Sequence, residues 1–158
     1  MRRAVIPVLG VTAYFLQQIQ TMIRQEIHLK RAHGWKVTCY YAVTHYETDE
    51  IIQRMMEAGA NADSLARAYD NLSSGNPDTG LCFSGDGESV LVISVTSSAE
   101  EFADSLAHEQ HHLASQIGSA LGWNLLGEDV CYLAGEIGRK MSAIASRYLC
   151  ECCRHSQE

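Results

Sequence analysis

The amino-acid sequence predicts an α+β domain in which a small antiparallel sheet packs beside a helical core. Two observations predict this class. Apolar residues recur every three or four positions in several segments, which is typical of amphipathic helices. Short runs of β-branched and aromatic residues lie between them, and a Gly-Asp-Gly turn at 85–87 separates two of these runs. The expected order is helix, strand, two helices, hairpin and two helices.

The first predicted helix covers residues 12–32 and ends at Gly34. Its apolar face comprises Phe15, Leu16, Ile19, Met22, Ile23 and Ile27. Two arginines precede the apolar N-terminal stretch, but no small-residue cleavage site of a signal peptide follows it. We therefore expect this stretch to be part of the fold and the protein to be cytoplasmic.

The next segments alternate between the two types of element. Residues 36–44 are rich in β-branched and aromatic residues and predict a strand. A helix is expected after it, with Thr48 as its N-cap and Gly59 near its end. A second, shorter helix is expected over about 62–71.

The second half begins with a predicted loop at 73–80, which is rich in Ser, Gly, Asn and Pro. Two apolar, β-prone runs flank the Gly-Asp-Gly turn and predict a β-hairpin. Ser98 and Glu101 then form the S-x-x-E pair of a capping box, which marks the start of a helix running to about residue 118. A last helix is expected over about 128–149.

Composition limits the possible partners. The chain has 158 residues and a formal net charge of -7, which argues against non-specific binding to nucleic acid or to an anionic membrane. No apolar run has the length that crosses a bilayer. We expect one domain over 1–149 and a Cys-rich tail over 150–158. In a cytosolic protein the six cysteines are expected to be free thiols or metal ligands.

The helix predicted after Ser98 carries the pattern H-E-x-x-H, formed by His108, Glu109 and His112. Histidines four residues apart lie on one face of a helix, where their ring nitrogens can bind one zinc ion. The glutamate is offset around the helix, so that its carboxylate can reach a water that the metal activates. Zinc lowers the pKa of that water, and Glu109 takes its proton and delivers it to a leaving amine.

A catalytic zinc needs a third protein ligand, and the last predicted helix offers one. Glu128 opens that helix, which can fold back antiparallel to the first because the connection is short. Tyr132 lies one turn further on and can hydrogen-bond a ligand histidine or stabilise an oxyanion. Asp129 and Glu136 are rival ligands, and Tyr132 is as well suited to core packing.

The sequences "HEQHH" and "EDVCYLAG" together resemble the gluzincin metallopeptidases, whose pattern is HExxH followed by a glutamate on the next helix. The small gluzincin-like group, which includes the ImmA/IrrE-type proteases, is the most similar. The resemblance covers about residues 80–140. It implies a zincin-like fold with an active-site helix and a glutamate helix. It further implies a zinc-dependent peptidase with His108, His112 and Glu128 as ligands, Glu109 as general base and acid, and a hairpin strand that pairs with an extended peptide substrate.

Other functions stay open at this point. The same residues are present in a metal-binding or partner-binding protein with a structural zinc site. A di-iron bundle needs a second Glu-x-x-His, which the sequence lacks. A thiol or zinc site in the tail would use Cys150, Cys152 and Cys153. His111 points about 100° away from His112 around the helix and is expected to face solvent.

Overall fold

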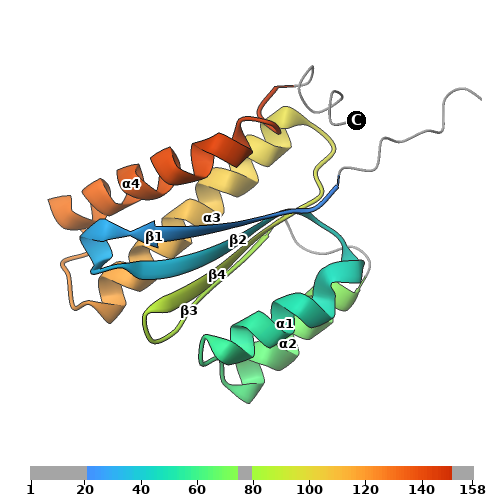
Figure 1. Ribbon diagram of the computed structural model, residues 1–158, viewed down its shortest axis with the longest axis horizontal. Helices are drawn as coiled ribbons and strands as arrows, with labels where there is room; N and C mark the ends of the chain where they lie inside the picture. Colours follow the sequence, from blue (N-terminus) through green and yellow to red (C-terminus); the bar gives the residue numbers. More distant parts are fainter. Residues whose placement is uncertain (1–20, 75–79, 151–158) are drawn as a thin grey trace, which may run out of the picture.

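The computed structural model describes residues 21–74 and 80–150 (Figure 1). Strands and α-helices alternate in pairs along this part of the chain. Their bounds are β1 Ile23–Leu29, β2 Trp35–Val43, α1 Thr48–Glu57, α2 Ala62–Ser73, β3 Gly80–Ser84, β4 Glu88–Ser94, α3 Ala99–Ala120 and α4 Glu128–Ala145. Short 3-10 helices, η1 (Lys30–Ala32) and η2 (His45–Glu47), follow β1 and β2. The predicted α+β class is confirmed.

The sheet has four strands in the order β1-β2-β4-β3 and is mixed, whereas an antiparallel sheet was expected. The outer pairs, β1 with β2 and β3 with β4, are antiparallel, and the central pair of β2 and β4 is parallel. The reason is that β4, and not β3, lies beside β2, and the hairpin turn has by then reversed the chain. The prediction of a hairpin is confirmed, and that of a wholly antiparallel sheet is wrong.

The predicted helix over 12–32 is also wrong where the structure describes it, because Ile23–Leu29 forms β1. Side chains along β1 alternate between partly or fully buried and exposed, as on a strand. Ile23 and Ile27 lie four residues apart, a spacing that fits one face of a helix and one face of a strand equally well. Pairing with β2 decides between them. Residues 12–20 lie outside the described part.

The remaining elements agree with the predictions, apart from one cap. Thr48 is the first residue of α1 and not its N-cap, and its hydroxyl donates to the carbonyl of His45 at 2.7 Å. The capping box at this junction is formed by Thr44 and Glu47 and caps the N-terminus of η2. Of the predicted loop at 73–80, residues 75–79 lie outside the described part of the chain.

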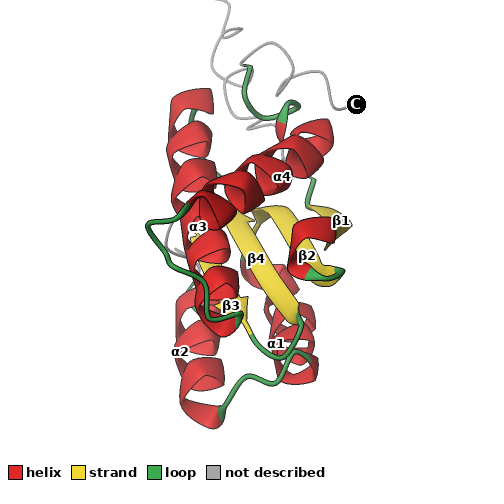
Figure 2. Cartoon of the chain, turned by 90° about the vertical axis from the view of Figure 1, so that its left-hand side faces the viewer, coloured by secondary structure: helices red, strands yellow, loops and turns green. Residues whose placement is uncertain are grey.

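Helices cover both faces of the sheet, so that the described fold has three layers (Figures 1 and 2). The pair α3 and α4 packs on one face, and the pair α1 and α2 packs on the other. Within the first layer, α3 lies over β3 and β4, whereas α4 lies over β1. In the described part of the chain, none of the helices combines the length and apolar character that crossing a membrane requires.

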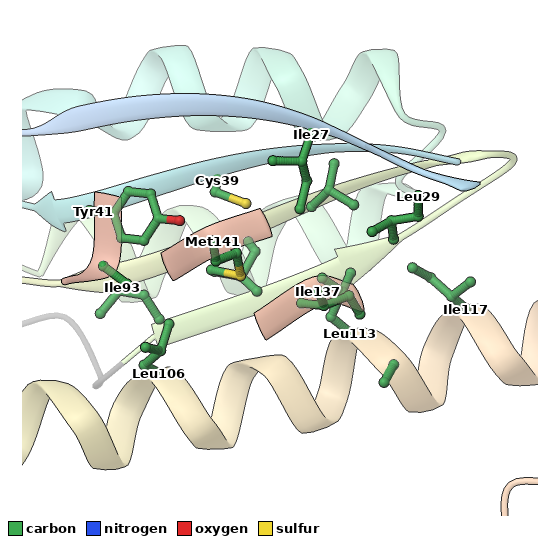
Figure 3. Packing of buried hydrophobic residues seen from close by; sticks show 14 of the residues in the cluster. Ile27, Leu29, Cys39, Tyr41, Ile93, Leu106, Leu113, Ile117, Ile137 and Met141 are labelled. Carbon is green, nitrogen blue, oxygen red and sulfur yellow. The ribbon is translucent and has the colours of Figure 1, made fainter. Parts of the chain in front are cut away.

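The larger core lies between the sheet and the α3–α4 layer (Figure 3). Alternate residues of the strands point into it, as the pleat of a β-strand requires. The residues labelled in Figure 3 are Ile27, Leu29, Cys39, Tyr41, Ile93, Leu106, Leu113, Ile117, Ile137 and Met141. This core fixes α3 and α4 against opposite halves of the sheet, which determines where the predicted site residues lie.

Candidate active site on helix α3

Helix α3 carries the H-E-x-x-H pattern in its middle. Its start is set by Ser98, whose hydroxyl accepts a hydrogen bond from the Glu101 amide at 3.1 Å. The Glu101 carboxylate reaches back to the amide and hydroxyl of Ser97, which satisfies a further donor at this helix start. A buried apolar stripe then holds the helix on the sheet; it consists of Phe102, Leu106, Leu113 and Ile117. The predicted helix and Ser98 as its N-cap are confirmed, and the Glu101 carboxylate bonds Ser97, one residue before the predicted capping-box partner.

His108 and His112 lie side by side on the exposed flank of α3. Their Nε2 atoms are 3.0 Å apart, and the two rings meet edge to face with centroids 4.7 Å apart. The side chain of His108 is 61% exposed. His111, between them in sequence, is exposed as well and turns about 100° away from His112 around the helix. The i,i+4 spacing therefore brings the two predicted nitrogen ligands together.

Glu109 turns inward from the same stretch of helix and is only 4% exposed. Its Oε1 lies 4.0 Å from Nε2 of His108. Within the described part of the chain its carboxylate accepts no hydrogen bond. Burial therefore raises the pKa of Glu109 above the usual value for glutamate, and the neighbouring His108 partly offsets this effect. The Glu109 carboxylate thus lies buried beside an exposed imidazole pair.

Strand β3 packs against the buried side chain of Glu109. A Cβ atom at Gly80 would lie 2.6 Å from Cγ and 2.9 Å from Cδ of Glu109, so the glutamate packs directly on the backbone of this glycine. One pleat further on, the Cys82 thiol donates to Oε1 of Gln116 at 3.8 Å, and Nε2 of Gln116 donates to the Cys82 carbonyl at 3.3 Å. These two contacts hold α3 against the edge strand of the sheet.

A groove of about 500 Å³ continues from this point between β3 and the second half of α3. It is lined by Cys82, Phe83, Ser84, Ser115, Gln116, Ser119 and Ala120. None of these described lining residues is charged. Burial, followed by the charge of Glu109, raises the pKa of the Cys82 thiol well above its usual value, so the thiol at the groove wall stays protonated.

The structure does not bring Glu128 to the histidine pair. Two residues further along α4, the Val130 side chain contacts α3 at Gly118, 2.9 Å from where a Cβ would stand. Residues two apart on a helix point about 160° apart, so Glu128 lies on the side of α4 away from α3 and is exposed. Gly118 is itself six residues, or roughly 9 Å, along α3 from His112. Asp129 is also exposed.

The orientation of α3 explains this separation. Gln110 faces α4, where its side-chain amide contacts the sulfur of Met141 at 3.5 Å. His112, two residues on, therefore faces away from α4. The pair thus lies on the β3 side of α3, and α4 packs on the opposite side.

Tyr132 lies near the opposite edge of the sheet. It is 53% exposed, and the guanidinium of Arg31 in η1 lies 4.8 Å from the centre of its ring. Strands β1 and β3 are separated by three interstrand spacings, or roughly 14 Å. The structure therefore places Tyr132 beside η1 and does not bring it to His108 and His112.

Glu136, a rival ligand in the sequence, has a different role in the structure. Its two carboxylate oxygens accept hydrogen bonds from the amides of Lys30 and Arg31, at 2.9 and 3.0 Å. Burial raises its pKa, but these two bonds and the charges of Lys140 and Arg139 outweigh burial, so the net pKa is lowered. The glutamate thus joins α4 to η1, a role that no local sequence pattern indicates.

Within residues 21–74 and 80–150 the structure contains no group of three or more His, Cys, Asp or Glu side chains arranged to hold a metal ion. Cys150 is partly buried, and Cys152 and Cys153 lie outside the described residues. Sequence reasoning also missed Gly80 and Gln116. The i,i+7 spacing of Glu109 and Gln116 places both on one face of α3, which was the available signal.

In comparisons with protein-family models, with curated proteins and with solved structures, no match to this chain was found.

Proposed function

We propose that this protein is a zinc-dependent peptidase in which His108 and His112 bind the ion and Glu109 transfers the proton. The observation that carries the proposal is the 3.0 Å separation of the two Nε2 atoms on the exposed flank of α3. Zinc binds imidazole nitrogen at about 2.0–2.1 Å with tetrahedral angles, which places two such donors about 3.3 Å apart. Two imidazoles that are already this close need little rearrangement to share an ion.

Glu109 supports hydrolysis over a purely structural metal site. Its Oε1 lies 4.0 Å from His108 Nε2, so a water beside the pair would be within reach of the carboxylate. A bound zinc ion supplies Lewis acidity, which activates water for attack on a peptide carbonyl. Glu109 then takes a proton from the attacking water and gives it to the amide nitrogen as the C–N bond breaks.

The edge position of β3 supports a peptide as the substrate. Among the described strands, β3 pairs with β4 alone, and Glu109 packs on its first residue, Gly80. An extended peptide can add to such an edge through backbone hydrogen bonds, which would carry a scissile bond past the histidine pair. The groove between β3 and α3 would then accept side chains of the same peptide.

The third protein ligand remains a prediction. Glu128 is exposed at the first position of α4, on the side away from α3. Its coordination to the ion that His108 and His112 bind therefore requires the first turn of α4 to rearrange toward α3. The comparison of Glu128→Gln with Asp129→Asn tests this. We expect the first change to weaken zinc binding by about tenfold or more, and the second to leave it unchanged.

The experiment that tests the proposal measures zinc content and peptide cleavage on the same preparations. We expect about one zinc ion per chain and hydrolysis of unstructured peptides in a mass-spectrometric assay. Glu109→Gln is expected to keep the zinc and to lose at least about 100-fold in kcat. A chain that binds zinc stoichiometrically but cleaves no peptide in a diverse library would contradict the peptidase and favour a non-catalytic metal site.

A further inference from the structure

The contact between Gly80 and Glu109 has no counterpart elsewhere in the described part of the sheet. A Cβ at position 80 would lie 2.6 Å from Glu109 Cγ and 2.9 Å from Cδ, which is closer than side-chain atoms approach in proteins. Because Cγ lies in the middle of the Glu109 side chain, displacing it also moves the carboxylate. Glu109 emerges from the middle of a 22-residue helix and is 4% exposed, so it has no open space to move into.

Other residues of β3 that face α3 do carry side chains. Cys82 faces Gln116 and exchanges two hydrogen bonds with it, which fixes the distance between strand and helix one pleat beyond Gly80. With that distance fixed, the space at position 80 is filled by the glutamate side chain. The strand cannot move outward to accept a larger residue without breaking the contact between Cys82 and Gln116.

We propose that Gly80 is a positioning residue: by lacking a side chain, it lets β3 hold the Glu109 carboxylate beside His108. The proposal rests on the function proposed above, in which Glu109 transfers the proton. No hydrogen bond from the described residues holds this carboxylate, so its position depends on packing alone. Packing against the Gly80 backbone and against the helix itself leaves the Oε1 atom 4.0 Å from Nε2 of His108.

The test introduces a single methyl group at position 80. In Gly80→Ala the Glu109 side chain must shift, and a displacement of about 1 Å at a proton-transfer group costs on the order of 10- to 100-fold in kcat. We expect the zinc content to stay within about twofold of that of the native chain, because the substitution alters neither histidine. Gly135→Ala is the matched control: Gly135 is exposed on α4, a Cβ added there would meet nothing within 4 Å, and its substitution should change neither quantity.

Because a Cβ at position 80 would also lie 2.6 Å from the Val92 carbonyl oxygen, a second measurement separates positioning from sheet packing. Gly80→Ala is introduced into the native chain and into Glu109→Ala, and the melting temperature of each metal-free protein is recorded. We expect a loss of at least about 5 °C in the native background and less than half of that loss without the Glu109 side chain. If Gly80→Ala folds only together with Glu109→Ala, the proposal is equally supported.

Equal losses in both backgrounds, or failure of both Gly80→Ala variants to fold, would overturn the proposal, since Val92 would then account for the effect. A carboxyl ¹³C resonance of Glu109 that is unchanged in Gly80→Ala would overturn it as well; the resonance is identified by its disappearance in Glu109→Gln. These stability and spectroscopic measurements do not depend on catalysis. Absence of cleavage by the zinc-loaded native chain would therefore contradict the peptidase while the two measurements still decide the role of Gly80.

Discussion

Two buried glutamates, Glu109 on α3 and Glu136 on α4, lie over opposite halves of one sheet. Their pKa values are shifted in opposite directions. Glu136 accepts two backbone hydrogen bonds and lies 3.9 Å from the Lys140 ammonium, and its pKa is lowered. Glu109 accepts none from the described residues, and its pKa is raised. A buried carboxylate that is fully bonded stabilises a fold, whereas one left without donors costs stability and is available for chemistry. The comparison therefore supports a structural role for Glu136, whereas Glu109 is the residue for which we propose proton transfer.

The largest expected effect concerns the zinc ion that we propose binds beside Glu109. His108→Ala and His112→Ala each remove one of two adjacent nitrogen donors, so we expect zinc affinity to fall by more than about 100-fold. Competition against a chromogenic chelator measures it. His111→Ala is the matched control, because this exposed histidine points to another side of the helix and should leave affinity unchanged. Equal losses from all three substitutions would contradict a site built on the pair.

Over the other half of the sheet, Glu136→Ala is expected to destabilise the protein by about 2–3 kcal/mol. The change leaves the amides of Lys30 and Arg31 without their acceptor in a partly buried junction. Urea denaturation measures the free energy of unfolding, and exposed Asp129→Ala on the same helix is the control. A loss below about 0.5 kcal/mol would contradict a structural role for Glu136.

At Glu109, in contrast, we expect a substitution to increase the free energy of unfolding. In the metal-free protein, Glu109→Gln replaces a buried charge that lacks donors by a neutral amide of the same shape, and we expect a gain of up to about 1 kcal/mol. The same urea titration applies, run in the presence of a chelator. A clear loss of stability would show that Glu109 contributes to packing in the way that Glu136 does.

The smallest expected effect is on the pH dependence of stability. Because the folded-state pKa of Glu136 is lowered, its ionised form stabilises the native state above the unfolded pKa, and this contribution is lost as the pH falls through the folded pKa. Glu136→Gln should therefore flatten the acid side of the stability curve between about pH 5 and pH 3. Thermal melts across this range measure it; an unchanged slope would contradict the lowered pKa.

Local patterns were reliable for most interactions that are themselves local, although the N-cap predicted at Thr48 was wrong. The cap at Ser98, the hairpin around 85–87 and the approach of His108 to His112 involve residues only a few positions apart, and each was predicted correctly. The segment Ile23–Leu29 was not, because its apolar spacing of four fits both a helix and a strand and only β2 distinguishes them.

Local sequence patterns could not predict which residues of α3 and α4 contact each other. Glu128 and Glu136 are both acids on the helix after the HExxH motif, and their sequence positions make either a candidate ligand. Contacts of Gly118 with Val130 and of Gln110 with Met141 set the face that each helix presents, and they turn both acids away from the histidine pair.

By itself, the sequence determined a capped helix with two imidazoles four residues apart and a glutamate offset from them around the helix, because helical geometry fixes such neighbours. Tertiary structure alone decided that β4 runs parallel to β2, that Glu136 caps η1, and that Gly80 meets Glu109. Those outcomes depend on packing between segments distant in the chain, where each contact is weak and only their sum selects one arrangement.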